Sequence, residues 1–234
     1  MILNFLSQSL DAHWNLAAED ALLNRGEPCS FFWRATDSVV IGKNQNPWLE
    51  CNLEAMATDG VPLARRISGG GAVFHDLGNL NYAFIESRQD YCPDHTYNRV
   101  IKVLQELGVN AERMGKSSIG VADQKISGNA FAYRRNHVLH HGTLLLGADL
   151  DKLHRYLAPP ELDMDTHAVR SEPAPVMNLK LDAESIIEAF GGGMPLPRID
   201  VDEARFANRE WVYGQTPKFV YQGAEIPKGQ AFEL

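Results

Sequence analysis

The chain has 234 residues, of which 44% are hydrophobic and 22% are charged, and its formal net charge is −8. This composition is that of a soluble globular protein, and it excludes disordered, collagen-like and coiled-coil chains. The acidic balance argues against a protein that coats nucleic acid.

The cysteines and the first residues bear on the cellular compartment. Cys29, Cys51 and Cys92 are too few and too scattered for a disulfide framework or a zinc site. The apolar run at residues 1–6 has no basic leader, and no apolar stretch is long enough to span a bilayer. We therefore expect a cytoplasmic protein that binds neither membrane nor nucleic acid.

The first predicted element is a helix over residues 11–25. Asp11 can cap its start, apolar residues recur at helical spacing, and Gly26 offers a stop. Strand-like apolar runs and a second amphipathic helix follow. In chain order, we expect strands at 31–33, 39–41, 72–74 and 81–85, and a helix over 97–107.

The second half of the chain continues this mixture of elements. We expect strands at 137–139 and 142–146, a short helix around 149–157, and a last helix from Asp182 to Phe190. Strands and helices do not alternate regularly, so the pattern predicts an α+β fold with a largely antiparallel or mixed sheet. No internal repeat or long linker divides the chain.

The densest motif is the run from Arg65 to Asp76. Its three consecutive glycines, residues 69–71, let the backbone approach a ligand closely, and the two preceding arginines suit phosphate or carboxylate groups. One interpretation is an anion cradle beside a strand. The other is a glycine-rich hairpin with solvated arginines. The run is neither a Walker loop nor a dinucleotide-binding motif.

Two further clusters carry polar side chains. Lys125 leads a turn of small residues, where its ammonium could reach a phosphate or a carbonyl, or could simply be solvated. The second cluster begins with His140 and His141. If these two lie on a strand, they face opposite ways and cannot easily bind one metal, and a histidine in the core is the alternative interpretation. The sequence gives little support for nucleophilic catalysis, since the Gly-x-Ser-x-Gly motif is absent.

Taken together, these segments resemble the lipoate–protein ligase A family. The match runs from about Phe31 to Phe219, on residues 39–48, 65–81, 125–130 and 140–146, with weaker echoes at 168–171, 176–179 and 211–217. The resemblance implies a catalytic domain over residues 1–220 and a C-terminal tail over 221–234. It also implies an α+β fold with a mixed, largely antiparallel sheet and flanking helices, similar to biotin ligases and class II aminoacyl-tRNA synthetases.

The resemblance also implies a two-step reaction. Lipoate attacks the α-phosphate of ATP to give lipoyl-AMP, and a lysine of an acceptor lipoyl domain then takes the lipoyl group. Mg²⁺ is expected with ATP because it screens the phosphates, with Asp76 or Asp123 as guesses for its ligands. The acceptors would be lipoyl domains of 2-oxoacid dehydrogenases or of the glycine cleavage system, with Arg134 and Arg135 as candidates for a basic docking patch.

Site residues follow from the same resemblance. Lys125 is expected to bridge the lipoate carboxylate and the α-phosphate, where its charge offsets the charge that develops during reaction. Arg66 is expected to neutralise phosphate charge. The pocket for nucleotide and lipoyl group is expected to be lined by Gly71, Ala72, Val73 and Phe74. Candidates of second rank for orienting the phosphate or shaping the pocket are Ser68, Gly70, His75, Asn79, Asn81, His141 and Thr143.

Several alternatives stay open at this point. Many family members carry a C-terminal accessory domain, so the chain could be a complete ligase, could need a separate accessory protein for adenylation, or could be a lipoyltransferase that uses preformed lipoyl-AMP. The absence of cysteine from residues 166–171 argues against a cysteine-dependent octanoyl or lipoyl transferase. The absence of a Gly-Arg-Gly-Arg run argues against a biotin ligase, and Lys125 argues against a non-catalytic lipoate binder.

Overall fold

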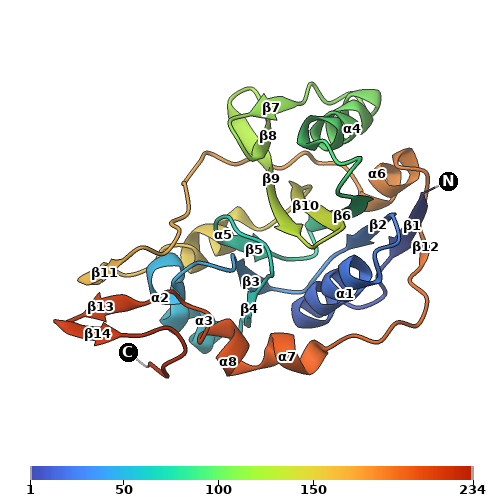
Figure 1. The fold of residues 1–234 in the computed structure, drawn as a ribbon. Helices are drawn as coiled ribbons and strands as arrows, with labels where there is room; N and C mark the ends of the chain where they lie inside the picture. Colours follow the sequence, from blue (N-terminus) through green and yellow to red (C-terminus); the bar gives the residue numbers. More distant parts are fainter. Residues whose placement is uncertain (1, 233–234) are drawn as a thin grey trace.

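The central feature of the fold is an eight-stranded sheet, seen in a computed structural model that describes residues 2–232 (Figure 1). In spatial order the strands are β12 (Met194–Pro195), β1 (Leu3–Leu6), β2 (Cys29–Trp33), β6 (Asn79–Ser87), β10 (His137–Leu145), β9 (Gln124–Tyr133), β8 (Ser118–Val121) and β7 (Glu112–Met114). β1 pairs in parallel with β12 and β2, and the other neighbouring pairs are antiparallel. The expected α+β fold with a mixed, largely antiparallel sheet is confirmed.

Helices cover both faces of this sheet (Figure 1). Successive residues of a strand face opposite sides, so Phe31 and Trp33 of β2 pack with α1 (Ala12–Arg25). Phe32 packs on the other side with α4 (Pro93–Glu106) and α6 (Ala183–Ala189). The sheet is therefore buried on both faces along its centre.

The ends of α1 are as the sequence predicts. The Asp11 side chain accepts a hydrogen bond from the backbone N–H of Trp14 at 2.9 Å, which satisfies one of the free donors of the first turn. Gly26 closes the helix in the left-handed region, with φ of 73°. These caps fix where the helix begins and ends, and thereby which of its residues face the sheet.

Two small sheets flank the large one. The first has the order β4 (Leu63–Arg65), β3 (Ser38–Ile41) and β5 (Val73–His75), and it packs with α3 (Leu53–Asp59) and α5 (Leu150–Tyr156). The short helix α2 (Pro47–Glu50) precedes α3, and its Trp48 contacts Phe219. The second has the order β11 (Met164–Thr166), β13 (Phe219–Tyr221) and β14 (Ala224–Ile226). Because β14 pairs with β13, residues beyond 220 continue this second sheet, and the division at residue 220 stays a prediction.

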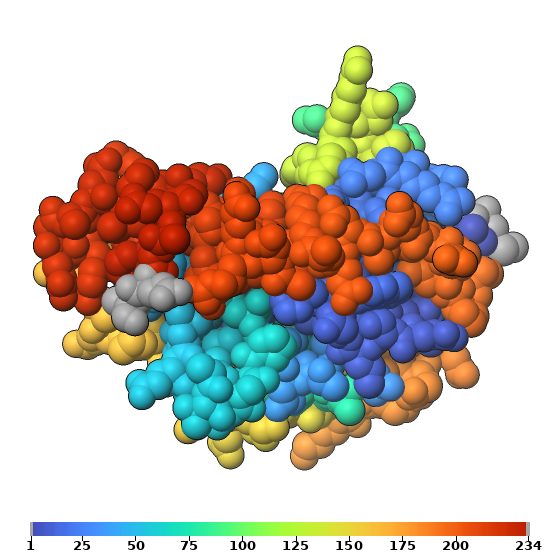
Figure 2. All heavy atoms as spheres, turned by 90° about the horizontal axis from the view of Figure 1, so that it is seen from below, coloured from blue at the N-terminus to red at the C-terminus, as the bar shows by residue number. Residues whose placement is uncertain are grey.

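The C-terminal part of the chain runs across one face of the molecule beside α1 (Figure 2). It includes α7 (Glu203–Ala207) and α8 (Arg209–Val212). The sequence predicts that α6 is the last helix, and this prediction is wrong. Phe206 packs into the core on the α1 side, and Arg205 pairs with Asp20 of α1 at 3.1 Å. These helices are short, and neither contains a full apolar period.

Three other predicted elements differ in extent. Lys125 does not lead a turn: it lies on β9, and the tight turn comes earlier, at Ala122 and Asp123, which both have positive φ. α4 begins at Pro93 because proline is well placed in a first helical turn. β10 is continuous through the two histidines, where the sequence predicts two separate strands. No helix in residues 2–232 is long and apolar enough to cross a membrane.

Candidate functional site

A cavity of about 580 Å³ lies between residues 70–73 and the strands β9 and β10. Its inner end is lined by the buried apolar side chains of Leu16, Trp33 and Val40, which come from α1, β2 and β3. Its outer end is lined by exposed polar residues, among them Lys116 and Glu172. The cavity therefore has buried apolar side chains at its inner end and exposed charged side chains at its mouth.

A chain of buried hydrogen bonds crosses the inner end. His141 Nδ1 lies 2.6 Å from Glu19 Oε2, and its Nε2 lies 2.6 Å from Ser68 Oγ. The other Glu19 oxygen accepts from Trp33 Nε1 at 2.9 Å. Because Ser68 Oγ also accepts from Arg66 Nε at 3.0 Å, the chain connects a buried carboxylate to a buried guanidinium.

Arg66 holds the three consecutive glycines at residues 69–71, the glycine segment. Its guanidinium donates to the carbonyls of Val40, Gly69 and Gly71, the last at 2.8 Å. Burial lowers the pKa of Arg66 to about 10, and the Glu19 carboxylate opposes this shift. Arg66 thus shapes the loop and adds positive charge to the wall of the cavity.

Arg65 has a different environment. Its side chain is fully buried and donates to the carbonyls of Gly42 and Gln45, to the Val212 carbonyl, and to Thr216 Oγ1. Burial lowers the pKa of Arg65 to about 10. The two arginines of the motif therefore separate: Arg66 lines the cavity, whereas Arg65 fastens β4 to the C-terminal segment.

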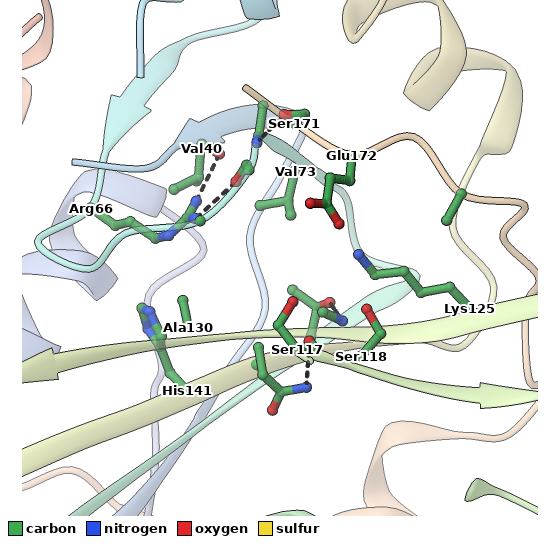
Figure 3. Close-up of a pocket in the computed structure, with 18 of the residues that line it drawn as sticks. Val40, Arg66, Val73, Ser117, Ser118, Lys125, Ala130, His141, Ser171 and Glu172 are labelled. Atoms are coloured by element: carbon green, nitrogen blue, oxygen red, sulfur yellow. Dashed lines mark hydrogen bonds between the residues drawn. The ribbon is translucent and has the colours of Figure 1, made fainter. Parts of the chain in front are cut away.

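Lys125 enters the cavity from the start of β9, and Figure 3 shows its side chain pointing toward Glu172. Its stem lies against Gly128, where an added Cβ would be 3.2 Å from Lys125 Cε. Burial lowers the pKa of Lys125, the positive charge of Arg66 lowers it further, and the Glu172 carboxylate opposes both. The cavity thus holds a half-buried cation between its apolar end and its mouth.

Comparison with known proteins identifies the family. The model of the lipoyl protein ligase A/B catalytic domain matches residues 11–190. The chain belongs to this family. Lipoate-protein ligase A of Psychrobacter cryohalolentis is 38% identical over 254 residues, which cover 94% of this chain and 75% of that protein.

Solved structures of lipoate ligases are similar as well. P. falciparum LipL1 in complex with lipoate is 30% identical, with a TM-score of 0.77 and coverage of 93% of this chain and 75% of that one. A lipoate-protein ligase A bound with ATP is 25% identical, with a TM-score of 0.72 and coverage of 92% of this chain and 98% of that one.

Most residues that the sequence selects for the ligase site do line the cavity. Those that do are Arg66, Gly70, Gly71, Ala72, Val73, His75, Asn81, Lys125, His141 and Thr143. They come from the connecting residues 66–72 and from β5, β6, β9 and β10. The register of the sheet places His141 beside Ala83 and Ala130. Segments more than fifty residues apart in the chain are thereby brought to one wall.

Three of the selected residues lie elsewhere. Phe74 alternates with its neighbours on β5, so its ring faces away from the cavity and packs on Tyr156 at 5.5 Å between centroids. Ser68 is buried behind His141, and Asn79 reaches only the Nδ1 of His75, at 3.5 Å. These residues support the lining of the cavity from behind.

His140 and His141 lie on opposite faces of the large sheet, as the strand alternation predicts, and His141 faces Glu19 of α1. His140 is fully buried on the α4 side, where its ring contacts Tyr97 and burial lowers its pKa to about 3. His75 stacks on Trp33 and accepts from Asn81 at Nδ1, and burial lowers its pKa to about 3 as well. Both rings are therefore neutral at physiological pH.

Several groups that line the cavity are not predicted from the sequence. Glu19 and Trp33 lie on elements that it predicts, yet nothing in the local pattern distinguishes a buried glutamate from a solvated one. Residues 114–118 and 169–174 also line the cavity, and they come from a hairpin turn and an extended segment. Their position depends on tertiary contacts, such as those of Glu50, which accepts from Gln45, Arg170 and Ser171.

Metal ligands and the basic docking patch are less well supported. Among residues 2–232, no group of three or more His, Cys, Asp or Glu side chains could hold a metal ion. Asp76 accepts from the backbone of Gly78 and Asp149, and Asp123 is exposed on a turn outside the cavity. Arg134 pairs with Asp20 of α1 at 2.6 Å, whereas Arg135 is exposed.

Proposed function

We propose that this protein is an ATP-dependent lipoate–protein ligase, which forms lipoyl-AMP and transfers the lipoyl group to a lysine of an acceptor lipoyl domain. The observation that carries the proposal is the position of Lys125, a half-buried cation between an apolar inner end and a charged mouth. Family membership supports it, as do the similar ligase structures that contain lipoate or ATP.

The inner end suits an acyl chain that ends in a ring. Leu16, Trp33 and Val40 remove apolar surface from water, which is the main source of affinity for such a ligand. Glu19 and His141 satisfy each other's polar atoms, so they add no unpaired group to this end. A carboxylate at the other end of the ligand would then lie toward Lys125.

In the first step, a lipoate carboxylate oxygen attacks the α-phosphorus of ATP and pyrophosphate leaves. Lys125 neutralises the negative charge of both reactants, which lets them approach in a site of low dielectric. Arg66 acts by holding Gly69–Gly71 and by adding positive charge. Mg²⁺ enters as part of the substrate MgATP, held chiefly by phosphates and water.

In the second step, an amine of the acceptor attacks the lipoyl carbonyl and AMP leaves. The negative charge that develops on the carbonyl oxygen is stabilised by the same ammonium of Lys125. One cation thereby serves both steps, and no nucleophile of the protein is required. The acceptors that we propose are lipoyl domains of 2-oxoacid dehydrogenases or of the glycine cleavage system.

Intact-mass measurement of an acceptor lipoyl domain tests this function. The purified chain is incubated with lipoate, MgATP and the domain, and a parallel sample receives preformed lipoyl-AMP in place of lipoate and ATP. We expect the mass of one lipoyl group in both samples. Modification in the second sample alone would mean a transferase, or a ligase that needs an accessory protein for adenylation, and modification in neither would refute the proposal.

A further inference from the structure

The segment from Ser171 to Met177 is fixed at both ends as it crosses the mouth of the cavity. At one end, the Ser171 amide and hydroxyl donate to Glu50, and the hydroxyl accepts from the Ala72 amide at 2.8 Å. At the other end, the Lys125 amide donates to Pro175 at 2.8 Å and the Met177 amide donates to Lys125 at 3.1 Å. Glu172 lies between these two anchor points, so its backbone has little freedom.

Glu172 faces Lys125 from this segment. Figure 3 shows the carboxylate and the ammonium pointing toward one another across the cavity. The side chain is exposed, and it makes no hydrogen bond or ion pair with another residue in the described part of the chain. The protein therefore holds the Glu172 carboxylate near Lys125 and does not use it for a structural contact.

The charges around the mouth make this carboxylate distinctive. Within residues 2–232, the acidic side chains that line the cavity are Glu19 and Glu172, and both oxygens of Glu19 are engaged at the inner end. The cationic side chains that line the cavity are Arg66, Lys116 of the β7–β8 turn, Lys125 of β9, and Arg170, which pairs with Glu50 at 2.8 Å. Among the residues that the structure describes, Glu172 is thus the carboxylate of the outer part of the cavity that is available to pair with an incoming ammonium group.

We infer that Glu172 receives the ε-ammonium of the acceptor lysine and takes one proton from it, which frees the neutral amine to attack the lipoyl carbonyl. In this step the C–N bond forms, the C–O bond to the phosphate of AMP breaks, and AMP leaves with that electron pair. The nitrogen loses two protons as it changes from ammonium to amide. The first moves to the Glu172 carboxylate before the attack and then to water, since the side chain is exposed. The second leaves the nitrogen as the amide forms and passes to water. The inference rests on the proposed ligase function. Because adenylation involves no amine, Glu172 is not needed for it.

Single-turnover transfer from preformed lipoyl-AMP to an acceptor lipoyl domain tests the inference, with wild type and Glu172→Gln. We expect the variant to bind lipoyl-AMP within about twofold of wild type, as measured by calorimetry. We expect its transfer rate at pH 7.5 to fall by about 100-fold, a typical contribution of a general base. The rate should recover as the pH rises toward the ordinary pKa of lysine, about 10.4, because the acceptor then arrives uncharged.

Two controls separate a proton-transfer role from a structural one. Hydroxylamine is uncharged at neutral pH, so both proteins should transfer the lipoyl group to it at the same rate. Glu161→Gln removes the same charge from an exposed residue outside the cavity, and its transfer rate should equal that of wild type.

Equal transfer rates for wild type and Glu172→Gln would overturn the inference and leave the ligase function standing. A loss that is the same with hydroxylamine and with lysine, or a matching loss of lipoyl-AMP binding, would also overturn it, because Glu172 would then serve the adenylate or a metal ion. If wild type itself transferred nothing from lipoyl-AMP, the proposed function would fail instead.

Discussion

His141 Nδ1 lies 2.6 Å from the Glu19 carboxylate, and both side chains are almost completely buried at the inner end of the cavity. Neither residue is close to the other in the chain: α1 carries the acid and β10 carries the base. The pair closes the apolar end of the site with groups that satisfy each other, and Trp33 supplies a further donor to the acid.

Removal of one partner of this pair should destabilise the fold. His141→Ala leaves the Glu19 carboxylate buried with one donor fewer, which should lower the free energy of unfolding by about 3 kcal/mol. Glu19→Gln keeps the shape of the side chain and an acceptor for Trp33, and should cost less. Urea unfolding of the two variants measures the difference, and equal stability of both with wild type would contradict a stabilising hydrogen bond between Glu19 and His141.

The glycine segment offers a matched pair of substitutions. Gly70 has φ of 85°, and an added Cβ would lie 3.0 Å from Arg66 Nη2, whereas Gly69 has open space around its Cβ position. Gly70→Ala should cost about 1–2 kcal/mol of backbone strain and displace Arg66, so we expect a raised KM for ATP. Gly69→Ala should behave as wild type in steady-state kinetics. A similar effect of both would show that the loop is not held as described.

Loss of the Arg66 side chain should change the KM for ATP more than the KM for lipoate. Arg66→Ala removes the guanidinium that bonds to Gly69 and Gly71, so the loop loosens and positive charge is lost from the wall. We expect the KM for ATP to rise well above that for lipoate. Equal changes in both constants would argue against a role on the nucleotide side.

Two buried histidines should make the protein sensitive to acid. Burial lowers the pKa of both His75 and His140 to about 3 in the folded protein, whereas in the unfolded chain they bind protons from about pH 6.5 downward. The free energy of unfolding therefore keeps the full contribution of these histidines above pH 6.5. It falls as the pH drops from there toward 3, by about 1 kcal/mol per histidine per pH unit. Urea unfolding between pH 7.5 and 5 should show this slope, and His140→Gln should reduce it by about half.

How far the sequence predicts this structure depends on the range of the interactions involved. α1 is predicted to its ends because Asp11 and Gly26 act locally on the helix that they cap. β9 is misjudged at Lys125 because small residues after a lysine are typical of turns, and only pairing with β8 and β10 makes them a strand. α7 and α8 are missed because helices of four or five residues have no measurable periodicity.

How far the sequence predicts the site also depends on the range of the interactions. The motifs select Lys125, Arg66, Gly70 and Gly71, which line one cavity, because these residues carry unusual local patterns. Glu19 is missed because its partners, Trp33 and His141, lie 14 and 122 residues away. Glu172 is missed because the contacts that position it are made by Glu50 and by the backbone of Lys125.

Lipoate-dependent exchange between ATP and pyrophosphate tests the role of Lys125 most directly. Wild type is compared with Lys125→Ala and with Lys102→Ala, which removes an exposed lysine on α4 away from the cavity. We expect exchange by wild type and Lys102→Ala, and a loss of at least about 100-fold in Lys125→Ala with an unchanged circular dichroism spectrum. Exchange at the wild-type rate by a folded Lys125→Ala variant would contradict the assignment of Lys125 to the reacting end of the site.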